Sequence, residues 1–404
     1  MANNENKLSF WSLAFLWCGA SISIAEILTG GFIAPLGFKI GLVTIIIGHL
    51  IGTVILALGG IIGTRERIPA ITSTRISFGL YGTYLFSILN VLQLLGWTAI
   101  MIKSAALSLN VISDTLWNIN NISLWIILIG LCICFWIFLG IKSFKKLNVI
   151  AVVLLFGLTL VLASVIFSNQ SLFSSIGDNS ISFGGALELS VVMPLSWLPL
   201  IADYTRFAKS EKAGTYGSFI GYFLGSSWMY VIGLGAAIVT QNPDPSAIML
   251  AANLGITAFG IVFLSTITTT FMDAYSAGVT FLNLMPKLNE KKVSIFMTVI
   301  GTLISLVFAI ENYDFFLYAI GSVFAPLFSI LLTDYFIIKV RTKVDEKLLL
   351  NIGAVVVWII GVSLYYVFIR YDFILGATLP TMIVTGLLYF VSWSFMKSWK
   401  LNEK

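Results

Sequence analysis

Long apolar runs separated by short polar segments extend along almost the whole chain. A helix needs roughly 20 apolar residues to cross a hydrocarbon core of about 30 Å, and these runs reach that length. They predict an all-α integral membrane protein in which helices carry every functional group. The twelve predicted spans are residues 10–37, 41–63, 80–108, 122–141, 149–168, 184–203, 215–240, 255–285, 293–310, 314–338, 348–369 and 373–396.

The composition agrees with this pattern, because 58% of the 404 residues are hydrophobic and only 10% are charged. A soluble domain of this length could not bury so much apolar surface. The three cysteines, Cys18, Cys132 and Cys134, all lie inside apolar runs. We therefore interpret them as packing residues and not as a disulfide framework or a zinc site.

Basic residues favour the cytoplasmic side of a membrane protein. With the amino terminus inside, all of the 23 basic residues except Lys39, Lys103 and Arg370 fall in cytoplasmic segments. The charge pattern thus predicts both termini on the cytoplasmic side of a bacterial inner membrane, and no binding of nucleic acid. We expect residues 1–8 to be retained and not cleaved with a signal peptide.

Small residues line one face of two predicted spans and predict close helix packing. They are Gly48 and Gly52 in the second span, and Gly217, Gly221 and Gly225 in the seventh.

His49 is the only histidine of the chain and lies within the first of these stripes. A lone histidine cannot form a metal cluster. An interhelical hydrogen bond is the favoured interpretation, and a proton relay is the alternative.

Glu26 lies in the middle of the first span, in a stretch of small and hydroxyl residues from Ser21 to Gly31. A carboxylate there opposes insertion by about 2.5–3.5 kcal/mol, so it is expected to face a cavity or a partner. The adjoining glycines and serines allow the backbone to open. We favour a functional role over an ion pair with Lys103 or a hydrogen-bonded packing role.

The sixth span contains Pro194 and Pro199, each of which removes a backbone donor and disturbs the preceding turn. Interrupted helices at corresponding places in two halves of a transporter indicate a binding site. Spans one and six are the first spans of two five-helix halves, so they predict such a site between them. A simple proline kink is the alternative.

The eighth span places Ser265, Thr268 and Thr269 on one helix face. Hard oxygen ligands without cysteine or histidine suit a cation such as sodium. Alternatively, these hydroxyls only bond the carbonyl one turn back.

Several motifs resemble the nucleobase:cation symporter family one, which contains cytosine, purine, allantoin and hydantoin permeases. They are residues 75–82, Gly96-Trp97, 138–140, 202–207 (Ala-Asp-Tyr-Thr-Arg-Phe) and 333–336 (Thr-Asp-Tyr-Phe). The first span is most similar to the subgroup of hydroxymethylpyrimidine, or thiamine-precursor, permeases.

The resemblance implies a leucine-transporter-type fold of two inverted five-helix repeats with broken helices 1 and 6. Residues 1–168 would form the first repeat, 184–338 the second, and 348–396 two accessory spans. It also implies a sodium site between spans one and eight. Its ligands would be the carbonyl groups of Gly19 and Ile22 with Ser265, Thr268 and Thr269.

For the substrate, the resemblance implies stacking on aromatic rings and polar contacts to the edge of the base. These roles fall on Gln93, Trp97, Ser196, Trp197 and Thr270. Thr270 stands where cytosine permeases have Asn, and Glu26 where they have Ser. Gln93 is displaced by one residue from the corresponding glutamine. Asp203 and Arg206, within the signature, are interpreted as cytoplasmic gate or packing residues.

A carboxylate accepts hydrogen bonds and complements a donor edge, such as the amine of a 4-aminopyrimidine. Glu26 therefore favours hydroxymethylpyrimidine over cytosine, whose carbonyl oxygen is an acceptor. We expect a cation-coupled importer that functions as a monomer, with sodium favoured over protons. A membrane enzyme or a channel is the remote alternative, because the sequence lacks a nucleophile with its base, a ligand cluster and a filter repeat.

Overall fold

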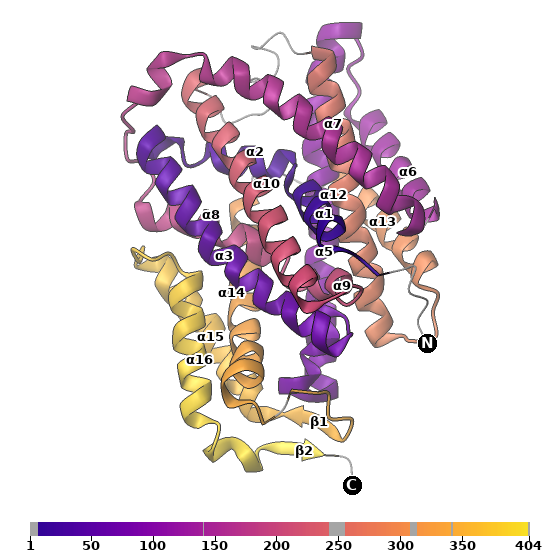
Figure 1. Cartoon of the computed structure of the whole chain (residues 1–404), viewed down its shortest axis with the longest axis vertical. Coiled ribbons are helices and arrows are strands. Elements are labelled where there is room, and N and C mark those ends of the chain that lie inside the picture. The colour runs from indigo at the N-terminus through magenta and orange to yellow at the C-terminus, as the bar shows by residue number, and fades with distance from the viewer. Residues whose placement is uncertain (1–6, 140, 242–254, 308–312, 341, 403–404) are drawn as a thin grey trace.

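The computed structural model describes residues 7–139, 141–241, 255–307, 313–340 and 342–402. Gly140, Arg341 and the end of the predicted span 293–310 lie outside the described residues. The chain forms a bundle of long helices (Figure 1). In the described part of the chain, eight helices are long and apolar enough to cross a membrane, and a bent pair of shorter helices would be a ninth.

The elements follow in chain order. They are α1 (Phe10–Ser21), α2 (Ile24–Gly31), η2 (Ala34–Leu36), α3 (Phe38–Glu66), α4 (Ala70–Ser73), α5 (Arg75–Trp117), α6 (Ile122–Leu139), α7 (Ile141–Phe167), η3 (Gln170–Ser174), α8 (Phe183–Ser196), α9 (Ile201–Thr205), α10 (Glu211–Thr240), α12 (Gly255–Leu284), α13 (Glu290–Val307), α14 (Tyr313–Leu332), η5 (Thr333–Ile338), β1 (Leu348–Asn351), α15 (Ile352–Arg370), α16 (Thr378–Ser392), η6 (Phe395–Ser398) and β2 (Lys400–Asn402).

Each of the twelve predicted spans overlaps one or more helices. The prediction was wrong at 348–351, which form β1 and pair antiparallel with β2 instead of opening a helix. Leu348 is buried there, and the carbonyl groups of Leu348 and Leu349 press against Gly79, whose φ of 77° only glycine adopts freely. The last span is also shorter than predicted, because α16 covers only Thr378–Ser392.

Both predicted helix breaks are present. The bent pair consists of α1 and the segment Ile24–Leu36, which meet at 58°. Ser23 caps α2, since its hydroxyl accepts the backbone N–H of Glu26 at 3.3 Å. In the sixth span, α8 ends at Ser196 and a turn over residues 197–200 separates it from α9. The two breaks confirm irregular backbone in the first and sixth spans.

Small residues bring α10 close to the first span. A Cβ atom at Gly221 would collide with the backbone of Ala14, and one at Gly233 with the backbone of Ile27. In α3, Gly48 and Gly52 approach α8 in the same way, at Ser190 and Val191. The predicted close packing at these stripes is therefore confirmed.

Glu188 is a buried carboxyl of α8 that joins this helix to α16. It accepts the backbone N–H groups of Ala377 and Thr378, both at 2.7 Å. The hydroxyl groups of Tyr365 and Thr378 also donate to it, at 2.7 and 2.6 Å. Glu188 thus satisfies the free donors at the amino end of α16.

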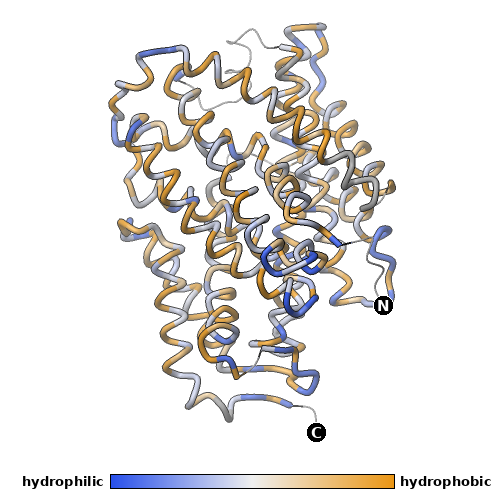
Figure 2. The backbone as a smooth tube through the Cα atoms, in the orientation of Figure 1, coloured by the Kyte–Doolittle hydropathy of each residue, from blue (hydrophilic) through white to orange (hydrophobic). Residues whose placement is uncertain are grey.

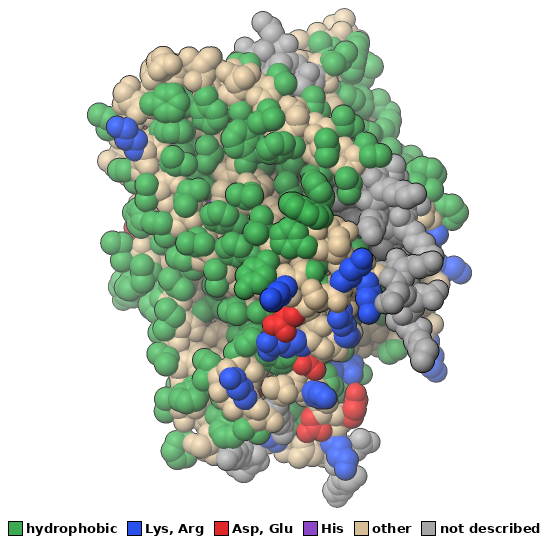
Figure 3. Space-filling view, in the orientation of Figure 1, with side chains coloured by type: hydrophobic (Ala, Val, Ile, Leu, Met, Phe, Trp, Pro, Cys, Tyr) green, Lys and Arg blue, Asp and Glu red, His purple; other side chains and the backbone are tan. Residues whose placement is uncertain are grey.

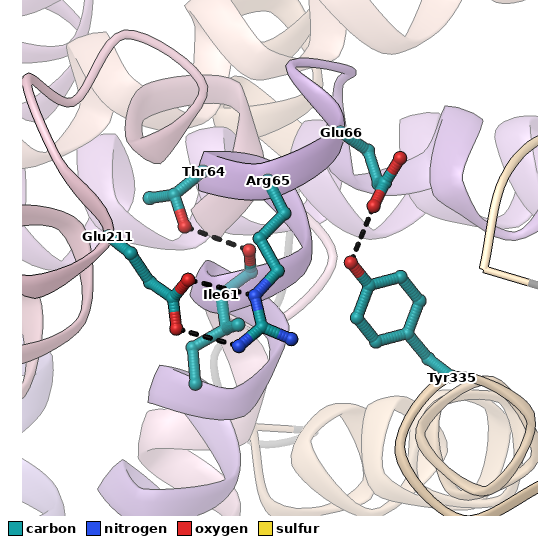
Figure 4. Close-up of polar contacts among 6 residues, drawn as sticks. All are labelled: Ile61, Thr64, Arg65, Glu66, Glu211 and Tyr335. Carbon is teal, nitrogen blue, oxygen red and sulfur yellow. Dashed lines mark hydrogen bonds and ion pairs between the residues drawn. The ribbon is translucent and has the colours of Figure 1, made fainter. Parts of the chain in front are cut away.

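Charged side chains gather toward one end of the bundle, and hydrophobic side chains cover most of the visible face (Figure 3). Hydropathy along the backbone places hydrophilic segments at the two ends of the bundle and hydrophobic ones along the helices between them (Figure 2). At the charged end Arg65 forms a two-point ion pair with Glu211, with both nitrogen–oxygen distances 2.8 Å (Figure 4). Tyr335 donates to Glu66 there at 2.5 Å. This end joins α3, α10 and η5.

Candidate functional site

An enclosed cavity of ≈ 20 Å³ lies between the two helix breaks. That volume holds about one water molecule. A pyrimidine ring can therefore enter only after side chains or helices move. The lining residues are Ser23, Ala25, Glu26, Trp97, Met101, Met193, Ser196, Trp197 and Asp273.

Four of the six predicted substrate residues line this cavity: Glu26, Trp97, Ser196 and Trp197. Gln93 does not line it, although its amide N–H donates to the backbone carbonyl of Ser196 at 3.4 Å. Thr270 is buried outside the cavity lining, and its hydroxyl has no hydrogen-bond partner within the described ranges.

The two tryptophans are held by edge-to-face contacts with other rings. Trp97 packs against Phe316 at 5.4 Å and Tyr313 at 6.1 Å between ring centroids. Trp197 packs against Trp17 at 5.8 Å. The buried indole N–H of Trp97 has no acceptor among the described residues, so it can donate to a ligand.

Glu26 is buried and faces α10 as well as the cavity. The Tyr222 hydroxyl donates to its Oε1 at 2.9 Å, and the Ser226 hydroxyl lies 2.6 Å from its Oε2. The described residues contain no ion pair between Glu26 and Lys103. A carboxyl group with two such partners keeps free lone pairs whether or not it carries a proton, so Glu26 can still accept a hydrogen bond from the cavity.

His49 also meets Ser226, from α3. Its Nε2 lies 2.7 Å from the Ser226 Oγ, and its Nδ1 lies 3.0 Å from the carbonyl oxygen of Ile45. The predicted interhelical hydrogen bond of His49 is confirmed.

Asp273 is a cavity residue that the sequence analysis did not single out. It lies on α12, is only 3% exposed, and its carboxyl makes no hydrogen bond within the described part of the chain. The rule that drew attention to Glu26, a carboxylate in the middle of a span, applies equally to Asp273. The cavity therefore has two carboxyl groups.

The proposed sodium ligands lie where α12 meets the end of α1. The Thr269 hydroxyl donates to the Ala20 carbonyl at 3.3 Å, which links the two helices. The Thr268 hydroxyl donates to the Ser265 carbonyl at 2.9 Å, and that of Ser265 to Val262 at 3.3 Å.

A hydroxyl whose proton points to a carbonyl still offers lone pairs to a cation. The chemistry of these oxygen donors therefore fits sodium. The α1 carbonyl that the structure places in contact with them is that of Ala20, whereas the carbonyl groups of Gly19 and Ile22 stay a prediction. The part of the chain that the structure describes contains no group of three or more His, Cys, Asp or Glu residues that could hold a metal ion.

Asp203, from the signature motif, is buried at the junction of α9 and α4. Its Oδ1 accepts the backbone N–H of Ala70 at 3.0 Å. The Arg206 side chain donates to the Asp203 carbonyl oxygen at 3.1 Å. The bond of Asp203 to Ala70 ties the sixth span to the segment that leads into α5.

Residues 1–393 match a family described as "Permease for cytosine/purines, uracil, thiamine, allantoin". The cytosine permease of Escherichia coli strain K12 is 25% identical over 329 residues, which cover 80% of this chain and 77% of that protein. The hydantoin permease of Microbacterium maritypicum is 22% identical over 421 residues, and this match covers 95% of this chain and 84% of that protein.

Solved structures of similar fold include Mhp1, a nucleobase-cation-symport-1 family transporter, in a closed conformation with bromovinylhydantoin bound. It has a TM-score of 0.80 and 19% identity, and the match covers 98% of this chain and 96% of that chain. A sodium-coupled sialic acid symporter has a TM-score of 0.70 and 15% identity, with coverage of 99% and 92%. The helical membrane-transporter fold is thus established.

Proposed function

Because the chain belongs to the family of permeases for cytosine/purines, uracil, thiamine and allantoin, we propose that it imports a pyrimidine, with hydroxymethylpyrimidine as the substrate. The observation that carries the proposal is the cavity between the two helix breaks, lined by Trp97, Trp197, Glu26 and Asp273. The family and its relatives are permeases and not enzymes.

The chemistry of the lining favours a flat, donor-rich solute. Indole rings supply apolar faces for a planar heterocycle. Two carboxyl groups supply acceptors for an exocyclic amine and a protonated ring nitrogen. Cytosine is the second candidate, because a cytosine permease is among the relatives. Its ring carbonyl, however, is itself an acceptor and cannot donate a hydrogen bond to these carboxyl oxygens.

The proposed coupling ion is sodium, bound by Ser265, Thr268 and Thr269 with the carbonyl groups of Gly19 and Ile22. Support comes from the contact of Thr269 with the end of α1.

The proposed setting is the bacterial inner membrane, with both termini in the cytoplasm and the monomer as the functional unit. The segregation of charge toward one end of the bundle supports this orientation (Figure 3).

Purified protein in liposomes tests the proposal. Uptake of labelled hydroxymethylpyrimidine should be saturable, should require an inward sodium gradient, and should fall when unlabelled hydroxymethylpyrimidine competes. A thermal-shift panel of hydroxymethylpyrimidine, cytosine, uracil and allantoin should rank the first highest. If cytosine alone stabilises the protein, the assignment passes to the second candidate.

A further inference from the structure

The contacts among Glu26, Ser226 and His49 form a continuous chain across α2, α10 and α3. Glu26 Oε2 lies 2.6 Å from the Ser226 Oγ, and that oxygen lies 2.7 Å from His49 Nε2. All three residues are at most 1% exposed. Glu26 reaches the cavity, whereas His49 does not line it. This chain of hydrogen bonds thus has one end at the candidate substrate site.

The number of protons shared by Glu26, Ser226 and His49 follows from the donors and acceptors in their hydrogen bonds. The Ile45 carbonyl can only accept, so His49 Nδ1 must carry a proton to make the 3.0 Å bond. The two bonds of Ser226 each need a proton between their heavy atoms. The serine hydroxyl supplies one proton, so Glu26 or His49 must supply the second.

We propose that Glu26, Ser226 and His49 form a proton-binding site that holds one exchangeable proton beside the cavity. With the proton on Glu26, the carboxyl donates to Ser226, Ser226 donates to Nε2, and every group is neutral. With the proton on His49, Nε2 donates to Ser226, Ser226 donates to Oε2, and an imidazolium faces a carboxylate. Both arrangements have no net charge.

The closed cavity keeps the proton on Glu26, because two neutral groups lose less solvation on burial than an ion pair. Without the proton, a buried carboxylate would remain and one bond of Ser226 would be lost. Closure of the site therefore favours the protonated chain. Opening of the cavity to water allows the proton to leave through Glu26.

No other charged group among the described residues neutralises this site. Tyr222 and Tyr230 face it from α10, Tyr230 with its ring 4.4 Å from that of His49. Asp273 faces the same cavity from α12, and Tyr313 of α14 bonds to Thr29, one turn after Glu26. These four groups are hydroxyls or an acid, so none of them supplies a cation to balance a deprotonated Glu26.

A ligand amine would move the proton along the hydrogen bonds from Glu26 to His49. An amine that donates to Glu26 stabilises the carboxylate. The Glu26 proton then passes to the Ser226 Oγ while the serine proton passes to Nε2, which leaves an imidazolium at His49. This second step rests on the proposed substrate, whereas the proton site itself does not.

His49 is the only histidine, so ¹⁵N-histidine NMR of the whole protein reports on one ring. Without ligand, Nδ1 should be protonated and Nε2 should accept a hydrogen bond. Raising the pH should shift the Nε2 resonance as the second proton leaves. Glu26→Gln should abolish this shift, because the amide supplies its own hydrogen to Ser226.

Asp178→Asn is the matched control, since Asp178 is an exposed loop carboxyl, and it should keep the parental pH response. A ring protonated only at Nε2, or an unchanged pH response in Glu26→Gln, overturns the proton site.

Addition of hydroxymethylpyrimidine should convert His49 to imidazolium in the parent and in Ser226→Thr, which keeps the hydroxyl, but not in Ser226→Ala. If the ligand-free results hold and the ligand leaves His49 neutral, the internal transfer is wrong while the proton site stands. If the ligand does not bind, the substrate proposal fails and the ligand-free NMR result still decides the proton site.

Discussion

At the scale of single residues, the apolar wall of the cavity gives a direct test. Trp97→Ala should weaken binding of hydroxymethylpyrimidine by about 1–3 kcal/mol, the range for bases stacked on aromatic side chains. Isothermal titration of the purified variant measures this loss. Trp11→Ala is the control, because Trp11 is 67% exposed and does not line the cavity. Parental affinity in a folded Trp97→Ala protein would move the site elsewhere.

Glu26 is the proposed specificity residue. Glu26→Gln keeps the size of the side chain but turns an acceptor toward the ligand amine into a donor. Uptake of hydroxymethylpyrimidine should therefore collapse, with a loss of a few kcal/mol in binding for one charge-assisted contact. Cytosine binding, if it is measurable, should suffer less.

Lys103→Met separates this role of Glu26 from a structural one. Because Glu26 bonds Tyr222 and Ser226, Lys103→Met should leave uptake unchanged. An equal loss of uptake in Glu26→Gln and Lys103→Met, together with lower thermal stability of both variants without ligand, would favour the ion pair with Lys103.

The sequence identified Glu26 because a carboxylate within a membrane span needs a reason to be there. It could not place Ser226 or Tyr222 beside it, since these lie about 200 residues away along the chain and meet Glu26 only through the packing of α10 on α2. Thr270 and Gln93 were assigned by resemblance. Both lie outside the cavity lining, about one helical turn from the lining residues Asp273 and Trp97 on the same helix faces.

At the scale of elements, the junction of α1 and α12 should carry the coupling ion. Replacing Thr268 and Thr269 together with Ala removes two oxygen ligands. Sodium should then no longer increase substrate affinity, because linkage between two ligands is reciprocal. Binding measured in sodium and in choline checks this.

Thr266→Ala provides the control, because within the described ranges the Thr266 hydroxyl bonds only the Val262 carbonyl of its own helix. If the parent protein binds substrate equally in both salts, the sodium site is misassigned.

The contact of α8 with α16 depends on Glu188. Glu188→Leu removes both acceptor oxygens and leaves the backbone N–H groups of Ala377 and Thr378 without a partner. Unfolding without ligand should become easier by about 1–3 kcal/mol, the usual loss for an unsatisfied buried donor. Thermal unfolding measures it. Asp372→Asn, at an exposed hydrogen bond to Ser182, should change little.

Helix breaks were predictable because they depend on local chemistry. The prolines of the sixth span and the small residues around Ser23 each weaken the helix at their own position. Strand β1 was not predictable in the same way. Leu348 and its neighbours have the composition of a span, and only pairing with Lys400–Asn402 makes them a strand.

At the scale of the whole molecule, hydrophobic runs and basic residues were enough to predict the bundle and the segregation of charge toward one end. The cavity volume was not predictable, because it depends on how the side chains of several helices interdigitate. The resemblance to known permeases gave the family, which the match over residues 1–393 confirms.

The small cavity has a kinetic consequence. Space of ≈ 20 Å³ excludes the substrate, so an encounter with the closed form is unproductive and binding must wait until the protein opens. In stopped-flow measurements of tryptophan fluorescence, the observed association rate should level off at high ligand concentration, at the rate of opening. A rate that rises in proportion to concentration throughout would mean that the closed form is seldom populated in solution.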